Sequence, residues 1–207
     1  MADQPRPYRM RRRAESQQQT RQRITESAVD LHGTLGPSRT SISAVAAHAG
    51  VRRSTLYRHF PDEGALFDAC TAHWAAANPP PDLSAWSTIE DPSERLTVAL
   101  AELYGYFERT EQMLENLFRD EQLPLVRERF GAFRSYFVMA QDTLMSGMGL
   151  RGAARRRTRA AVGHAIAFST WKSLVREQRL GDAEAIGLMC ALIAGARRRI
   201  AAVRNAP

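Results

Sequence analysis

Apolar side chains recur three and four residues apart along most of the 207-residue chain, as in residues 24–35 and again in residues 42–49. This spacing gives a helix one apolar face that can be buried against other helices. No run of four to eight residues alternates cleanly between polar and apolar, as a half-buried strand would. We therefore expect an all-α protein of about nine helices.

Glycine and proline mark the ends of the expected helices. The proline cluster in residues 78–82 is the clearest break, so we expect one domain over residues 16–77, whose last helix acts as a connector, and a second over residues 83–207. Residues 1–15 contain five arginines and two prolines without an apolar period, which predicts a disordered basic arm. The predicted helices span about 16–35, 40–49, 53–60, 62–77, 93–109, 111–120, 124–148, 153–179 and 182–203.

Cysteine usage and hydropathy restrict the class of protein. Cys70 and Cys190 lie far apart in the sequence, and the N-terminal stretch is arginine-rich and polar, unlike a secretory leader. The longest uncharged apolar run, residues 185–196, is shorter than the roughly 18 residues that suggest a membrane span. We expect a cytoplasmic protein with reduced cysteines and no membrane partner.

Charge is segregated along the chain. Residues 1–78 carry 11 arginines and 7 acidic residues (+4), residues 79–150 carry 6 basic and 12 acidic residues (−6), and residues 151–207 carry 12 basic and 3 acidic residues (+9). All 11 arginines of the first segment lie within residues 6–58. Clustered arginines of this kind indicate a phosphate-binding surface, on nucleic acid or on an anionic membrane.

Residues 46–60, "AAHAGVRRSTLYRHF", join the end of one helix to a short basic helix through a glycine turn. In a helix-turn-helix unit, the second helix enters the major groove of DNA with its N-terminal residues close to base edges. Leu56 and Phe60, four residues apart, would face the core and leave the arginines outside. The alternative interpretation of the pattern is a solvated basic face on a small helical bundle.

Residues 40–69, "TSISAVAAHAGVRRSTLYRHFPDEGALFDA", resemble the DNA-binding signature of the TetR family of transcriptional repressors. The positions that match or are conservatively replaced are Thr40, Val45, Ala46, Ala49, Gly50, Val51, Thr55, Leu56, Tyr57, Phe60 and Leu66. The resemblance implies a three-helix DNA-binding domain, followed by a C-terminal helical bundle for ligand binding and dimerisation. Its target would be a palindromic double-stranded DNA operator.

The resemblance also implies which residues contact DNA: Thr40, Ser41, Ser43, Arg52, Arg53, Ser54, Thr55, Tyr57 and His59. Three positions depart from the family pattern. Arg52 and Ser54 replace the usual serine and glycine, so base preference should differ. Glu63 replaces a lysine that the resemblance implies would touch a phosphate, so that contact is in doubt.

The C-terminal half is expected to dimerise and to hold a small-molecule inducer. The helix over 182–203 is apolar nearly all round and the middle of 153–179 is rich in small residues, so a second copy of the chain would bury both. The candidate ligand contacts are Tyr104, Phe107, Met113, Leu117, Phe118, Phe137, His164, Phe168 and Trp171. An aromatic stripe of this kind also occurs in an ordinary core.

Other sites are not indicated by the sequence. "GMGLRG" over residues 147–152 matches a nucleotide-loop pattern but lies between helical stretches, so we interpret it as a turn. We expect no metal, no cofactor and no catalytic constellation. The alternatives left open are a related DNA-binding protein without a small ligand, a helical adaptor for protein interactions, and a small enzyme using His164 or Cys190.

Overall fold

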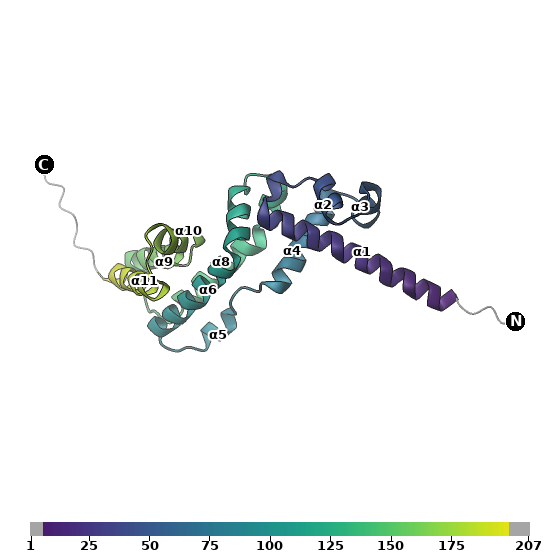
Figure 1. Cartoon of the computed structure of the whole chain (residues 1–207). Coiled ribbons are helices and arrows are strands. Elements are labelled where there is room, and N and C mark those ends of the chain that lie inside the picture. Colours follow the sequence, from purple (N-terminus) through teal and green to yellow (C-terminus); the bar gives the residue numbers. More distant parts are fainter. Residues whose placement is uncertain (1–5, 199–207) are drawn as a thin grey trace. The chain divides into compact units, whose positions relative to one another are not determined.

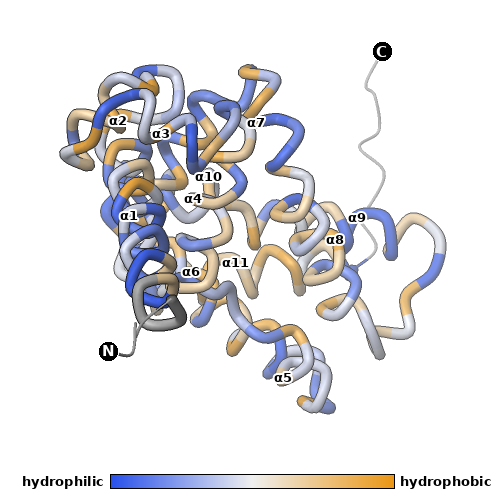
Figure 2. Tube along the Cα trace, turned by 90° about the vertical axis from the view of Figure 1, so that its right-hand side faces the viewer, coloured by the Kyte–Doolittle hydropathy of each residue, from blue (hydrophilic) through white to orange (hydrophobic). Residues whose placement is uncertain are grey.

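The computed structural model describes residues 6–198, with side chains from Met10 onward, and in this part of the chain every regular element is helical (Figure 1). The elements in order are α1 (Arg6–Thr34), η1 (Pro37–Arg39), α2 (Ile42–His48), α3 (Arg53–His59), α4 (Glu63–Ala77), α5 (Leu83–Ser87), α6 (Pro92–Arg119), α7 (Pro124–Arg129), α8 (Gly131–Met145), α9 (Gly152–Ala165), α10 (Phe168–Trp171), η2 (Lys172–Glu177) and α11 (Asp182–Arg197). The all-α prediction is confirmed. Hydrophilic and hydrophobic stretches follow one another along the coils of the helices (Figure 2), as expected when one face of each helix is apolar and the other polar.

The chain packs as two units. The first contains the chain up to Pro79 together with Glu111–Phe130, and the second contains Pro80–Thr110 together with the chain from Gly131. The predicted boundary near residues 78–82 therefore coincides with the first point at which the chain passes from one unit into the other, between Pro79 and Pro80. The single expected domain over 83–207 is corrected, because Glu111–Phe130 packs with the N-terminal helices.

The first unit has one apolar core built by α1, α2, α3, α4 and α7. Its buried residues are Ile24, Ala28, Ile42, Val45, Ala46, Ala49, Leu56, Phe60, Leu66, Phe67, Cys70 and Val126. The apolar residues that recur within 24–35 and 42–49 supply much of this core, because residues three and four apart share a helix face. The largest fully buried side chains of the second unit are Trp86, Leu100, Leu103, Tyr104, Tyr106, Phe107, Leu144 and Trp171.

The basic arm expected over residues 1–15 is wrong for residues 6–15, which form the first turns of α1. Arg11 Nε lies 3.0 Å from Glu15 Oε1, one helical turn away, and such pairs support an exposed helix. Residues 1–5 lie outside the described part of the chain. The loss of apolar periodicity therefore marks the point where α1 leaves the core.

Several helix boundaries differ from the predictions. The helices expected over 93–109 and 111–120 are one helix, α6. Thr110 does not break it, because its hydroxyl donates to the Tyr106 carbonyl one turn earlier, at 2.6 Å. The helix expected over 124–148 breaks at Phe130 into α7 and α8. The helix expected over 153–179 becomes α9, α10 and the π-helical η2.

The remaining differences concern the turns and the last helix. Helix α5 was not predicted. The glycine-rich segment before α9 is a turn, as expected, because Gly147, Gly149 and Gly152 all have positive φ values of 74°, 64° and 56°. Helix α11 ends at Arg197, and the continuation expected to residue 203 lies outside the described residues beyond Arg198.

Candidate nucleic-acid interface

Helix α2 and the turn after it are held by local hydrogen bonds. The Ser41 hydroxyl oxygen accepts from the Ala44 amide at 3.1 Å and caps the free N-terminus of the helix. At the other end, Gly50 has φ +63° and the Val51 amide donates to the Ala46 carbonyl at 2.9 Å. A left-handed residue followed by this bond ends a helix sharply and turns the chain toward the next one.

Helix α3 is fastened to the core by Leu56 and Phe60, whose side chains are fully buried. The rest of α3 is polar: within Arg53–His59 there is no acidic residue, and Arg53, Ser54, Tyr57 and Arg58 are exposed. One buried anchor within α3 and a second immediately after it therefore fix its orientation. Its arginine and hydroxyl side chains project outward.

Arg21 of α1 links α1 to α3, a role that its sequence neighbourhood does not indicate. Its guanidinium donates to the carbonyl of His59 at 2.6 Å and lies 4.1 Å from the centre of the Phe60 ring. The charge-assisted hydrogen bond satisfies a carbonyl at the end of α3, and the cation lies over an aromatic face. Only its position on the core-facing side of α1 could have indicated this role.

The electrostatics of the α3 surface favour an anionic partner. The Arg53 guanidinium lies 5.9 Å from the centre of the Tyr57 ring, so both side chains extend along the same exposed side. Burial lowers the pKa of His59 from its ordinary value, and the nearby Arg58 and Arg21 lower it further. A neutral His59 can still donate a hydrogen bond to phosphate from one ring nitrogen.

All nine predicted DNA contacts lie between Thr40 and His59, and the structure brings them onto the α2 and α3 elements of the first unit. Ser41, Ser43, Arg52, Arg53, Ser54 and Tyr57 are exposed, whereas Thr40, Thr55 and His59 are half-buried. The Thr40 hydroxyl proton is engaged, because it is donated to the Gly36 carbonyl at 2.8 Å. Their roles in binding DNA remain predictions.

The segment 111–130 is bonded to the end of α1, which the sequence did not indicate. The Asn116 amide donates to the carbonyls of His32 at 3.0 Å and Gly33 at 2.6 Å, and Arg119 donates to the Leu35 carbonyl at 2.9 Å. The Asp120 carboxylate accepts from the Ser38 amide at 2.9 Å. The last turns of α6 thus bind the backbone that leads into α2.

A cluster of aromatic rings lies in the second unit around Phe107. Its ring centre is 6.3 Å from that of Tyr104, 6.1 Å from Phe137, 5.5 Å from Phe168 and 6.0 Å from Trp171. The Tyr104 hydroxyl donates to the Ala165 carbonyl at 3.1 Å. The indole Nε1 of Trp171 is buried and has no hydrogen-bond partner within the described residues.

The other four candidate ligand contacts are His164, Met113, Leu117 and Phe118. His164 is exposed on α9, with Nδ1 3.2 Å from the Thr170 hydroxyl. Met113, Leu117 and Phe118 belong to the first unit, where Leu117 packs against the core and the Phe118 ring meets Phe130 edge-on at 5.2 Å. These three residues pack within the first unit, and the roles of all nine residues in ligand binding remain predictions.

Between residues 6 and 198, no three His, Cys, Asp or Glu side chains come together in a way that could hold a metal ion. None of the helices in that range is both long and apolar enough to cross a bilayer.

A capped helix, a left-handed glycine turn and a second helix with buried anchors and a basic outer side together define a helix-turn-helix unit of the DNA-binding class. Residues 24–70 match the family described as bacterial regulatory proteins, tetR family. A stretch of 57 residues is 40% identical to the HTH-type transcriptional regulator AcrR of Shigella flexneri. That match spans 28% of this chain and only 26% of the length of AcrR.

Solved structures show the same fold over most of the chain. A TetR-like transcriptional regulator from Rhodococcus sp. RHA1 superposes with a TM-score of 0.62, at 21% identity, covering 84% of this chain and 93% of that one. NalD, the secondary repressor of the MexAB-OprM multidrug efflux pump in Pseudomonas aeruginosa, superposes with a TM-score of 0.56, at 20% identity, covering 88% and 97%. Residues 24–70 thus match the tetR family, and the chain has a TetR-like fold.

Proposed function

We propose that this protein is a transcriptional regulator, acting as a repressor, that binds a palindromic DNA operator as a homodimer. The observation that carries the proposal is helix α3, whose buried Leu56 and Phe60 leave a continuous basic and hydroxyl-rich surface exposed. Arg53 at the first turn of α3 can pair in bidentate fashion with guanine, and the exposed hydroxyls of Ser41, Ser43 and Ser54 can donate to phosphate or base atoms.

The interpretation as a merely solvated basic face is less consistent with how α3 is held. A solvated face does not need a fixed orientation, yet α3 is fixed by a left-handed glycine turn at one end and by Arg21 at the other. The cap on α2 and the bonds from Asn116 and Arg119 hold the neighbouring backbone as well. Sequence readout requires such rigidity, because base contacts depend on placing a few side chains accurately.

Dimerisation is supported by the outer side of α11. Ala185, Ile186, Met189 and Ile193 of this helix are buried within the chain, whereas Leu188 and Leu192, one turn apart, are 47% and 46% exposed. Two leucines aligned on one helix face form a surface that a second copy of α11 can cover. The two reading helices of such a dimer would bind successive major grooves of an inverted repeat.

A small, mainly apolar ligand is supported by the aromatic cluster of the second unit. A buried donor without a partner costs free energy, and the Trp171 Nε1 is such a donor among the described residues. A ligand with a carbonyl, carboxylate or ether oxygen would accept this hydrogen bond while its apolar part contacts Phe107 and Phe168. Ligand binding would favour the state of the dimer that fits the operator less well.

The test of DNA binding begins with selection of bound duplexes from a random pool by the full chain. Against the selected duplex, Arg53→Ala should weaken binding about tenfold to a hundredfold and relax the preference at one base position, because a bidentate arginine contributes about 1–3 kcal/mol. Tyr57→Ala should weaken binding to all sequences to a similar extent. Titration of labelled duplex at fixed salt measures both effects.

Arg156→Ala is the matched control, since Arg156 is an exposed arginine on α9 in the second unit. It should bind the duplex as the wild type does. If Arg53→Ala and Arg156→Ala bind equally well while both remain helical by circular dichroism, the assignment of α3 as the reading helix is wrong. Failure to select any duplex would favour the helical adaptor instead.

A further inference from the structure

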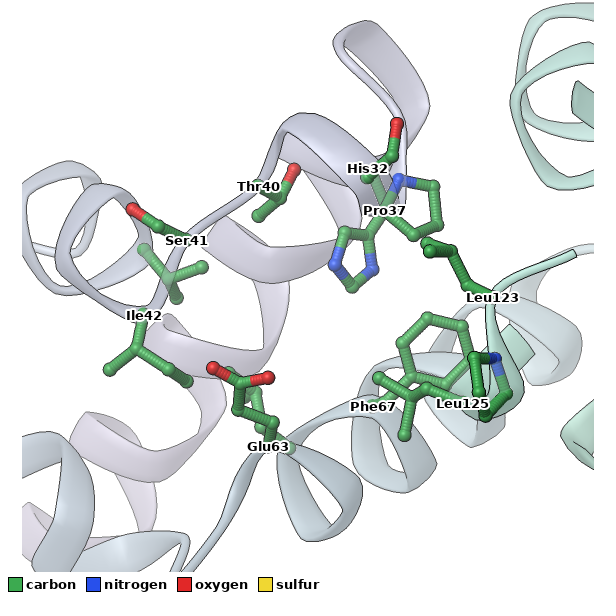
Figure 3. A pocket seen from close by; sticks show the side chains of 13 residues that line it. His32, Pro37, Thr40, Ser41, Ile42, Glu63, Phe67, Leu123 and Leu125 are labelled. Atoms are coloured by element: carbon green, nitrogen blue, oxygen red, sulfur yellow. The ribbon is translucent and has the colours of Figure 1, made fainter. Parts of the chain in front are cut away.

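The first unit contains an open pocket of about 300 Å³, formed by the end of α1, the segment from Pro37 to Val45, the start of α4 and residues 123–125 (Figure 3). Every lining residue belongs to this one unit. The volume is at the lower end of the range typical of small-ligand sites. We call it the α1–α4 pocket; it is separate from the aromatic cluster to which the proposed inducer would bind.

The ring of His32 points into the α1–α4 pocket, as Figure 3 shows. The residue is nevertheless only 8% exposed. Its Nδ1 lies 3.3 Å from the Cys70 Sγ, and this thiol donates to the Phe67 carbonyl at 3.2 Å. Burial raises the pKa of the Cys70 thiol to about 12, so the thiol keeps its proton. Since that single proton goes to Phe67, we assign the other hydrogen of the pair to Nδ1, which donates to sulfur.

This assignment leaves the lone pair of His32 Nε2 as an acceptor. Burial lowers the pKa of His32 to about 4, so the ring is neutral at pH 7. Within residues 10–198, no group donates a hydrogen bond to Nε2. An acceptor that faces an open pocket and has no donor among the described residues is available to a ligand N–H or O–H.

Glu63 supplies the second polar group. Its carboxylate points toward the same opening as the His32 ring (Figure 3), and within the described residues it forms no ion pair. The hydroxyl oxygen of Ser41, also in the lining, already accepts from the Ala44 amide, and the Thr40 hydroxyl already donates to Gly36. The charged group in the lining is thus the anionic Glu63, and His32 Nε2 adds a neutral acceptor, while the Ser41 hydroxyl keeps its own proton.

The remainder of the lining is apolar. Leu66 and Phe67 of α4 are buried, and Leu125 is half-buried. The Phe67 ring lies with its centre 5.2 Å from that of His32, so an apolar group beside the imidazole would also contact this phenyl ring. Such a wall favours a compact hydrocarbon body.

We propose that the α1–α4 pocket binds a small organic ammonium ion with a compact apolar body, its N–H groups donating to Glu63 and His32 and its hydrocarbon packing on Phe67 and Leu125. A cation is favoured because Glu63 carries a negative charge and His32 Nε2 accepts a hydrogen bond. A neutral alcohol of the same shape lacks the charge, and a carboxylate would be repelled by Glu63.

The test uses the full-length chain without DNA and 2-phenylethylammonium chloride as the probe. Calorimetric titration should give a Kd on the order of 1 mM, in keeping with a ligand of this size. In 15N-edited spectra of the histidine rings, the probe should shift the Nε2 signal of His32, assigned by its loss in His32→Gln. The neutral analogue 2-phenylethanol should bind at least about tenfold more weakly.

Glu63→Gln should weaken the ammonium probe by about tenfold or more while leaving 2-phenylethanol unchanged. Since Glu63 is exposed, the variant should fold as the wild type does. Glu90→Gln, which removes an exposed carboxylate in the second unit, is the control and should bind the probe normally. Equal affinities of Glu63→Gln and Glu90→Gln, or a His32 signal that does not move at saturation, would overturn the proposal.

Discussion

Gly50 sets the direction of the chain between α2 and α3. Its φ of +63° lies in the left-handed region, and no atom lies within 4 Å of the position a Cβ would occupy. The cost of a side chain here is therefore a backbone cost alone. Gly50→Ala should destabilise the protein by about 1–2 kcal/mol, measured by urea unfolding, whereas Gly50→Asn should cost less because asparagine tolerates this conformation. Equal losses for the two variants would argue against this explanation.

His32 makes the stability of the first unit depend on pH. Its pKa falls from 6.5 to about 4 on folding, mainly through burial and despite the nearby Asp120, which raises it. Between these pH values the unfolded chain binds more protons, so stability decreases as the pH falls from 6.5 toward 4. The loss attributable to His32 should reach about 3 kcal/mol.

Urea unfolding at pH 7, 5.5 and 4.5, at one protein concentration, measures this dependence. His32→Phe keeps a ring but cannot titrate, so its stability should fall less steeply over the same interval. His73→Gln removes an exposed histidine of α4 and should retain the steep dependence because His32 is intact. Parallel curves for the wild type and His32→Phe would contradict the assignment.

At the scale of elements, α1 and α3 are joined through Arg21. Arg21→Ala removes the hydrogen bond to the His59 carbonyl and the contact with the Phe60 ring. We expect a loss of about 1–2 kcal/mol in the free energy of unfolding. Arg23→Ala, two residues along α1 and exposed, should stay within about 0.5 kcal/mol of the wild type.

The Arg21 prediction has a second readout. Because Arg21 holds the end of α3, Arg21→Ala should also weaken binding to a selected duplex, even though Arg21 itself is not among the predicted DNA contacts. If Arg21→Ala and Arg23→Ala are equally stable, the bond seen between α1 and α3 contributes nothing measurable.

Within residues 6–198, helix α6 is the one helix whose residues belong to both units. Its first part, up to Thr110, packs in the second unit, and from Glu111 onward it packs in the first. The last turns carry Asn116 and Arg119, which bond to the backbone at the end of α1. A shift of α6 along its axis would therefore act on the backbone that leads into α2, which is a physical route for the proposed regulation.

At the scale of the whole molecule, the proposed dimer can be tested by its mass. The double substitution Leu188→Glu and Leu192→Glu places two charges on the exposed side of α11 and should convert a dimer into a monomer in analytical ultracentrifugation. Val138→Glu changes an equally exposed apolar residue on α8 and should leave the dimer intact. A double variant that still sediments as a dimer would place the interface elsewhere.

Local patterns in the sequence determined much of this protein. The periodicity of apolar residues predicted an all-helical chain, and residues 46–60 predicted the end of one helix, a glycine turn and a short basic helix. These features depend on hydrogen bonds and side-chain spacing within a few residues, so the sequence carries them directly. The match of residues 24–70 to the tetR family agrees with that prediction.

Tertiary structure alone decided the contacts between distant segments. Nothing near Arg21 in the sequence indicates that it bonds to His59, 38 residues away, or that Asn116 bonds to Gly33. The same holds for the unpartnered Trp171 Nε1 and for the meeting of His32 with Glu63 in one pocket. Long-range packing selects these partners by shape and by the need to satisfy buried polar groups, and neither is visible in a local pattern.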